Sequence, residues 1–217
     1  MSISNTFIRF VFAFSFFFIS FALIAEPTLE EVVVSARKVD ESVQDVPIAM
    51  SVFTSSDISD AGIERPEDFI ALTPNVVMAN TVNVGDTLVT IRGLTSTRDA
   101  ESNFAFVVDG VLQTNPNAFN RELLDIAQIE VLKGPQGALY GRNATSGAIL
   151  ITTKAPSEES ESTAVIGMGV NNASKLQYVN SGKMGDNVYT RFSVSTRETD
   201  GEPVSYTHLT LPTKRIV

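Results

Sequence analysis

The chain has 217 residues, of which 43% are hydrophobic and 19% are charged, and its formal net charge at pH 7 is −9. This length and apolar content suffice for one ordinary core and part of a second unit, which argues against disorder throughout. The acidic balance disfavours nucleic-acid binding, which needs a cationic surface. The absence of cysteine excludes disulfides and thiolate metal sites, and the single His208 is too little for a Ser-His-Asp triad or an ordinary zinc site.

Residues 1–25 have the pattern of a secretory signal peptide. One positive charge precedes the almost wholly apolar run Phe10–Ile24, and Ala25 stands before polar residues. An uncleaved membrane anchor is the alternative, but about 15 apolar residues fall short of the roughly 20 that a spanning helix needs. We therefore expect export of the chain, with cleavage after Ala25.

Residues 28–38 place two glutamates before three consecutive valines and a basic pair. Three β-branched residues at an exposed N-terminus would be unusual for a core strand. Their stiffness and unpaired backbone suit the addition of this segment as a strand to the sheet edge of another protein. A plain edge strand of the following domain is the alternative, and the residues alone leave both interpretations open.

From Val46 onward the sequence predicts small α/β elements. The first are a strand near Ile48–Phe53 and a helix that Ser55 or Ser56 opens and Gly62 stops. Serine hydroxyls cap helix N-termini, and glycine commonly follows the last helical residue.

A second helix is predicted to begin at Pro66, where the two acidic residues that follow suit the positive end of a helix dipole, and to end at Pro74. Two apolar runs, Thr87–Ile91 and Phe104–Val108, follow as short buried strands, because each ends in a turn signal. The turn signals are Arg92-Gly93 and Asp109-Gly110.

Residues 129–156 contain a strand, a glycine-studded turn, a short helix and a second strand. The strands are Ile129–Leu132 and Gly147–Thr153, and the intervening glycines permit backbone angles or close approaches that a Cβ would forbid. Pro135 can open the one-turn helix. The turn is not a phosphate-binding P-loop, since GPQGALYGRN lacks both the glycine spacing and the lysine.

Beyond the hydrophilic linker 157–162, hydrophobicity alternates with a period of two. The alternation is clear over Ile166–Val170 and Val188–Ser195, and a weaker strand lies between them at Leu176–Ser181. Strands of about 9 to 11 residues with this pattern are typical of transmembrane barrels, apolar toward lipid and polar toward the lumen. A soluble hairpin sheet would show the same alternation, so the residues alone leave both open.

Two further features carry no predicted function. Residues 205–212 resemble the in-frame translation of a sequencing-library adapter, so we expect 204–217 to be a non-native tail; an ordinary strand is the alternative. Paired glutamates at 30–31 and 158–159 lie in tail and linker, where nothing would hold them for acid-base catalysis. No enzyme activity is therefore expected.

The stretch Ile129–Pro156, IEVLKGPQGALYGRNATSGAILITTKAP, closely resembles the end of the plug domain of TonB-dependent outer-membrane receptors. Pro66–Val76 also resembles a plug helix that precedes a strand, and the IRG and VDG elements occur in the same order in the family. The resemblance covers most of Glu30–Pro156. It implies an α/β plug domain, a small mixed β-sheet with short helices and loops, followed by the first antiparallel strands of a truncated transmembrane β-barrel.

The resemblance also implies a division of the chain. The expected segments are a signal peptide at 1–25, a TonB-box segment at 26–38, the plug domain at 39–156, a linker at 157–162, truncated barrel strands at 163–203 and the non-native tail at 204–217. A family barrel has about 22 strands, so the approximately three strands expected here would make a non-transporting fragment.

Two sets of site residues are carried over from the family. The TonB box, the extended segment that the energy-transducing partner TonB reaches from the periplasm, is expected at Glu30, Glu31, Val32, Val33, Val34, Ser35 and Ala36. Arg92 and Lys133, each directly before a glycine, are expected to pair with glutamates on the inner barrel wall and to hold the plug. Surface cations beside turns are the alternative. Relatives often have arginine where this chain has Lys133, and lysine lacks the bidentate fork.

Two polar loops, residues 95–103 and 113–120, are bounded by strands and rich in turn formers. Binding residues concentrate on such loops when a rigid scaffold holds them, and the family's outer plug loops face the arriving ligand. Solvated turns without a ligand are the alternative. The candidate ligand-facing residues are Arg98, Asp99, Asn103, Gln113, Asn115 and Asn117.

The function implied by the resemblance is uptake of a scarce ligand, such as a ferric siderophore, across the bacterial outer membrane into the periplasm. TonB, outer-membrane lipid and the small ligand are the expected partners, without nucleic acid, metal or cofactor. Haem, cobalamin or an oligosaccharide would serve equally as the ligand. One alternative is a secreted soluble ligand-binding module without a barrel. A TonB-coupled signalling receptor would need an extra N-terminal domain, for which only residues 26–29 are available.

Overall fold

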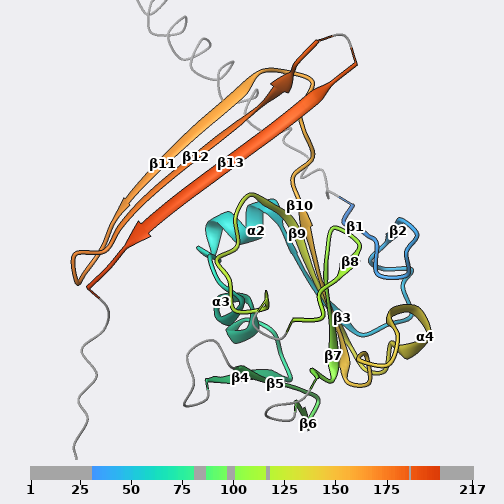
Figure 1. Cartoon of the computed structure of the whole chain (residues 1–217). Coiled ribbons are helices and arrows are strands. Elements are labelled where there is room, and N and C mark those ends of the chain that lie inside the picture. Colours follow the sequence, from blue (N-terminus) through green and yellow to red (C-terminus); the bar gives the residue numbers. More distant parts are fainter. Residues whose placement is uncertain (1–30, 81–86, 97–100, 116–117, 186, 201–217) are drawn as a thin grey trace, which may run out of the picture.

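The computed structural model of the chain describes residues 31–80, 87–96, 101–115, 118–185 and 187–200. At its centre lies a five-stranded sheet in the order β3-β9-β10-β7-β8 (Figure 1). Its strands are β3 (Met50–Thr54), β9 (Ile126–Lys133), β10 (Gly147–Thr153), β7 (Phe104–Val108) and β8 (Val111–Leu112). Strand β10 runs parallel to β7 and antiparallel to β9, so the predicted small mixed sheet is confirmed.

Each central strand contributes to two cores, because successive side chains of a strand point to opposite faces of the sheet. On β10, Ile149 and Ile151 belong to one core, whereas Ala148 and Leu150 belong to the other. Strands β7 and β9 divide their side chains in the same way. We call the two sides the helix face and the N-terminal face, after the segments that cover them.

The helix face is covered by two short helices and a small sheet, which lie together on one side of the central sheet (Figure 1). These elements are α2 (Ser55–Asp60), α3 (Pro66–Ala71), β4 (Val76–Asn80), β5 (Thr87–Ile91) and β6 (Leu94–Thr95). Phe119 packs edge-on against Phe104 and Phe106, with ring centroids 5.2 and 5.0 Å away. Both predicted helices are present, but Thr54 rather than a serine caps the first, through a hydrogen bond from the Asp57 amide.

The N-terminal face is covered from the opposite side by β1 (Val33–Val34), β2 (Glu41–Ser42) and α4 (Gly137–Tyr140). The one-turn helix thus begins two residues after the predicted Pro135. A Cβ added at Gly147 would lie 2.2 Å from the Leu132 carbonyl oxygen, so the close pairing of β9 with β10 requires glycine there.

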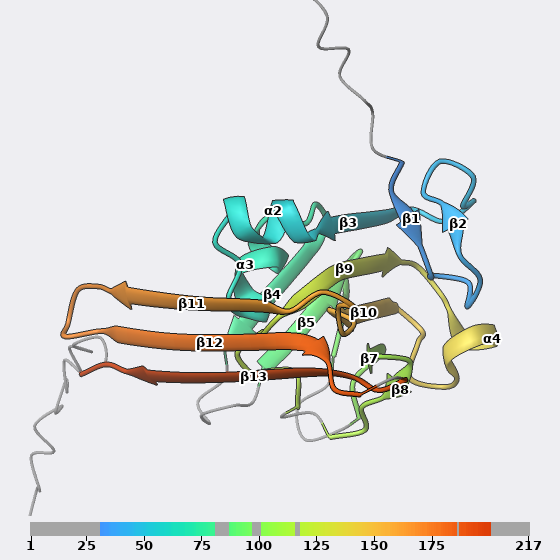
Figure 2. The same ribbon diagram turned by 90° about the horizontal axis from the view of Figure 1, so that it is seen from above.

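Three long antiparallel strands form a separate sheet, which we call the outer sheet. They are β11 (Glu161–Met168), β12 (Ser174–Lys183) and β13 (Tyr189–Glu198), and they lie side by side along one side of the central domain (Figures 1 and 2). Strand β11 begins at Glu161, inside the predicted linker. Ile166 and Phe192 point outward, 73% and 62% exposed, whereas Ser181 is buried. Exposure alternates with a period of two along β12 and β13, as predicted, whereas nearly all of β11 is exposed.

Candidate functional site

The segment predicted to bind a partner lies against the N-terminal face instead of standing free. Strand β1 pairs only with β2 within the described residues, and Val34 and Ala36 are buried in the core of this face at 1% and 0% exposure. Val33, the first residue of β1, is 48% exposed. The side chains of Val34 and Ala36 are therefore part of the core of this face, because the central sheet needs an apolar cover on this side. Glu30 lies outside the described residues.

Polar contacts fix the register of this segment on the sheet. The Glu130 Oε1 atom accepts hydrogen bonds from the Ser35 amide at 3.0 Å and the Ser35 hydroxyl at 3.2 Å. The Tyr140 hydroxyl donates to the Ala36 carbonyl at 2.8 Å. Gln128 Nε2 donates to the Val33 carbonyl at 3.0 Å. The sheet therefore holds the segment largely through main-chain atoms.

Glu130 is the one fully buried carboxyl group of the described residues, at 2% exposure. Burial raises the pKa of the Glu130 carboxyl, Asp40 adds to the rise, and the hydrogen bonds from Ser35 oppose it. Burial and the Glu130 charge together raise the pKa of Tyr140 to about 12. This cluster is electrostatically unfavourable for the charged form of Glu130.

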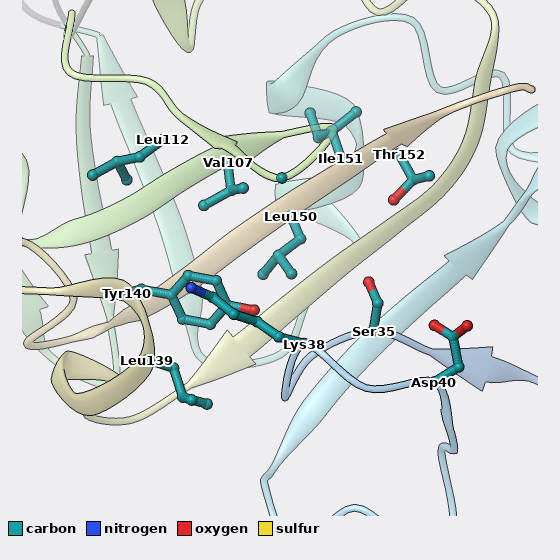
Figure 3. A pocket seen from close by; sticks show the side chains of 11 residues that line it. Ser35, Lys38, Asp40, Val107, Leu112, Leu139, Tyr140, Leu150, Ile151 and Thr152 are labelled. Atoms are coloured by element: carbon teal, nitrogen blue, oxygen red, sulfur yellow. The ribbon is translucent and has the colours of Figure 1, made fainter.

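A cavity of about 490 Å³ opens beside this cluster, between the N-terminal segment, α4 and the central sheet (Figure 3). Its floor is apolar, and the Lys38 side chain lies over the Tyr140 ring, with Nζ 5.6 Å from the ring centroid. The lining residues are Ser35, Lys38, Asp40, Val107, Gly110, Leu112, Leu139, Tyr140, Leu150, Ile151 and Thr152.

A second polar interface ties the central domain to the outer sheet. Three acidic residues face basic residues of β12 and β13. They lie in the loop that follows α2 and in the loop that precedes β9, and we call these three residues the acidic corner. Glu64 contacts Lys175 at 2.8 Å and Arg197 at 2.6 Å. Glu122 lies 3.7 Å from Lys175, and Asp125 forms a two-pronged contact with Arg191. The members of the acidic corner are Glu64, Glu122 and Asp125.

The Asp125–Arg191 pair is the most shielded of these contacts, because the side chains are only 9% and 11% exposed. The Leu123 amide donates to the Glu64 carbonyl at 2.7 Å, which joins the two acidic loops. Burial opposes the charged form of Glu64, but Lys175 and Arg197 together outweigh it and lower the pKa of Glu64. The acidic corner is therefore a built contact between the two sheets.

The predicted latch residues lie side by side at one end of the central sheet. Lys133 Nζ donates to the Ser51 hydroxyl at 3.0 Å, and burial, followed by the charge of Arg92, lowers the pKa of Lys133. Arg92 is exposed, with φ at 51° in the turn that was predicted for it. Within the described residues neither cation forms a salt bridge. At the contact with the outer sheet, by contrast, the central domain supplies the acids and the outer sheet supplies the cations. In the predicted latch the central domain would supply the cations.

Three of the six predicted ligand-facing residues fall within the described structure. The Asn103 side chain accepts from Ser96 and Ser146 and donates to the Leu94 carbonyl, so it joins strand ends. Gln113 is half-buried and donates to the Val111 carbonyl at 3.2 Å. Asn115 is exposed. The other three, Arg98, Asp99 and Asn117, lie outside the described residues.

Several residues of these interfaces escaped sequence reasoning. Glu130 carried a signal, since a lone carboxyl group stands within an apolar strand at a position that shares a face with Leu132. Lys175 and Arg191 stand at the polar positions of alternating strands, which marks the face but not the partner. Among the described residues there is no cluster of three metal-ligating side chains. That same part of the chain contains no helix both long and apolar enough to cross a membrane.

The central domain is the part of the chain that matches a protein family. The sequence model of the TonB-dependent receptor plug domain matches residues 42–148. The chain belongs to the TonB-dependent receptor plug domain family. The resemblance found in Ile129–Pro156 is thereby confirmed, as is the plug fold.

Relatives of the plug are receptors and transporters, not enzymes. The pesticin receptor of Yersinia enterocolitica is 31% identical over 132 residues, which cover 60% of this chain and 19% of the relative. The vitamin B12 transporter BtuB of Vibrio vulnificus is 28% identical over 184 residues, which cover 82% of this chain and 29% of the relative. The chain thus spans under a third of these relatives. A further match is the ferrichrome outer membrane transporter of Escherichia coli, which supports the predicted outer-membrane localisation.

Solved structures show the same plug. The ferric yersiniabactin uptake receptor FyuA from Yersinia pestis superposes with a TM-score of 0.64 at 26% identity, over 68% of this chain and 24% of that chain. FpvAI in its complex with pyocin S2 superposes with a TM-score of 0.68 over 77% of this chain and 22% of that chain, and at 19% identity it supports the fold alone.

Proposed function

We propose that this plug, with the outer sheet as its first wall strands, serves a TonB-dependent outer-membrane receptor that takes up a scarce ligand into the periplasm. The observation that carries the proposal is the two-sided outer sheet. Its apolar side chains point away from the plug, where lipid would cover them, and its cations Lys175, Arg191 and Arg197 pair with the acidic corner.

Energy would enter through the TonB box, Glu30–Ala36. Strand β1 has one unpaired edge within the described residues and the exposed Val33 side chain, which suits addition of a partner strand. Arg92 and Lys133 would serve as the latch, because two adjacent cations without carboxylate partners in the described chain are suited to bind acids of wall strands beyond β13.

The ligand would meet the loops that carry the candidate residues. Asn115 is exposed there, while the side chain of Asn103 already bonds within the plug and would act by shaping the loop. A ferric siderophore is the class we favour, since FyuA, which superposes on the plug at 26% identity, is a ferric yersiniabactin uptake receptor.

Uptake measurements in cells that express the receptor test this function. Deleting Glu30–Ala36, or substituting Val33→Pro to remove an amide donor, should abolish uptake of radiolabelled iron supplied as ferric siderophores and leave surface binding unchanged. Val39→Pro, at an exposed position past the box, is the matched control and should transport normally. Equal loss of uptake and binding would contradict the assignment.

Cell fractionation separates the receptor from the secreted soluble module. A receptor is recovered with outer membranes and needs detergent for extraction. Recovery in the soluble fraction with retained ligand binding would favour the module.

A further inference from the structure

The docked TonB-box segment must leave the plug before another protein can pair with it along its length. Its Val34 and Ala36 side chains are buried against the central sheet, and its Ser35 amide and hydroxyl both donate hydrogen bonds to Glu130. Detachment therefore exposes apolar surface and breaks these bonds. The free energy of docking sets how often the segment is available.

Glu130 makes an unusual contribution to that free energy. Its Oε1 atom receives the Ser35 bonds, whereas Oε2 is buried and has no hydrogen-bond partner in the described structure. A buried carboxylate without a cation is costly, because neither water nor an opposite charge replaces its hydration. Detachment of the segment lets water reach the carboxylate and removes that cost.

The groups around Glu130 include no cation directed at it. Besides Ser35, only the neutral Gln128 amide, whose Nε2 atom donates to Oε1 at 3.3 Å, contacts the carboxylate among the described residues. From the N-terminal segment the nearest charge effect comes from Asp40, which is also acidic, and Lys38 is directed to the Tyr140 ring. From α4, Tyr140 stays protonated at neutral pH. Neighbours on β9 and β10 on this face include Leu132, Ala148 and Leu150, which are apolar.

We propose that Glu130 is a positioning residue with two opposed effects: through Ser35 it fixes the register of the docked TonB-box segment, and through its uncompensated charge it keeps that docking weak. The proposal rests on the proposed function for the identity of the segment's partner. Its physical content, a carboxyl group that both aligns and loosens the segment, concerns this chain alone.

The sign of the pH dependence follows from the raised pKa of Glu130. The docked state binds the proton more tightly than the released state, so docking is strongest below the released pKa. It weakens by roughly tenfold per pH unit between the released and the docked pKa and is constant above the docked pKa. Glu130→Gln keeps the Oε1 acceptor but cannot ionise, so docking should become tighter and independent of pH.

Cysteine labelling of the full chain in detergent micelles tests this, because the chain has no cysteine of its own. Val34→Cys introduces a thiol at a 1% exposed position of the segment, and Val89→Cys places a control thiol at a 0% exposed position of the helix face. Labelling with a pyridyl disulfide is followed from pH 4 to 8, and each rate is divided by that of the denatured chain at the same pH.

Glu130→Gln should slow labelling of Val34→Cys at pH 8 by roughly tenfold for each unit by which the pKa is raised, remove its pH dependence and leave Val89→Cys unchanged. Glu130→Leu, which lacks the acceptor for Ser35, should label faster than Glu130→Gln. Faster or unchanged labelling in Glu130→Gln would overturn the loosening effect. Equal rates in the Leu and Gln variants would overturn the positioning effect.

Two further measurements keep the outcome decisive. If a Glu130 variant labels at Val89→Cys, its fold is damaged and Ser35→Ala replaces it; wild-type Glu130 with Ser35→Ala must then label Val34→Cys faster, or the positioning effect is wrong. Binding of the purified periplasmic domain of TonB is measured separately on the same variants. Weaker TonB binding with slower labelling supports both proposals, whereas slower labelling without any TonB binding contradicts only the function.

Discussion

The plug is held on two sides by different chemistry. On its N-terminal face, the N-terminal segment 31–36 docks by apolar burial and main-chain hydrogen bonds, and the carboxyl group there has no cation. At the acidic corner, three carboxylates meet three cations of the outer sheet. Detachment of the first interface lets water reach a buried carboxylate that has no cation. Detachment of the second interface leaves buried charges without their partners. One side of the plug is suited to release and the other to permanent attachment.

The largest effect is expected from breaking the acidic corner at Asp125→Ala. This substitution leaves Arg191 unpaired at 11% exposure and should lower the free energy of unfolding by roughly 3 to 5 kcal/mol. Thermal unfolding in detergent measures it, and labelling of Val179→Cys, buried on β12, reports separation of the outer sheet. Glu101→Ala is the matched control: its pair with Arg142 is 57% and 85% exposed, so a loss under about 1 kcal/mol is expected.

A smaller loss is expected from Val34→Ala in the docked segment. Removing two buried methyl groups should cost about 2 kcal/mol of docking free energy, measured as faster amide hydrogen exchange in residues 33–36. Val33→Ala, the neighbouring half-exposed position, should change exchange little. If both variants behave alike, burial of Val34 does not hold the segment.

Tyr140→Phe tests the main-chain contacts of the same interface. Without the hydroxyl group the Ala36 carbonyl loses its donor, which should weaken docking by about 1 kcal/mol in the same exchange measurement. Tyr178→Phe, on the exposed side of β12, is the control. Stronger protection in Tyr140→Phe would contradict the role of this bond.

Acid should move the two interfaces in opposite directions, with the smallest effect of the four. The lowered pKa of Glu64 means that its pairing contributes stability above its ordinary value of 4.5 and loses it as the pH falls through the lowered pKa. The raised pKa of Glu130 means that docking of the segment gains as the pH falls. Labelling of Val179→Cys should rise below pH 4 while that of Val34→Cys falls. A parallel response would remove the distinction between the interfaces.

The local pattern of the sequence predicted the strands of the plug well. Thr87–Ile91, Phe104–Val108 and Gly147–Thr153 have the predicted bounds. In the first two, a turn signal directly after a short apolar run marks where the strand ends. The predicted turns at Arg92-Gly93 and Asp109-Gly110 are present with positive φ at every residue, as tight hairpin turns require.

The interfaces could not be predicted because they join distant parts of the chain. Ser35 and Glu130 are 95 residues apart, and Asp125 and Arg191 are 66 residues apart. Val33 and Val34 form an extended strand, as predicted, but which face of which sheet buries Val34 depends on the whole fold. Similarly, the alternation of β13 located Arg191 on the polar side without indicating that its partner would be an acid of the plug.

The two sides of strand β1 are in different surroundings. The plug contacts its main chain and its inward side chains, Val34 and Ala36, while Val33 projects outward. The inward positions determine how the strand docks on the plug. Under the proposed function, the outward positions determine how another protein recognises it. Under the proposed function, such a receptor could adapt to a changed partner by substitutions at the outward positions, while the inward positions keep the strand docked on the plug.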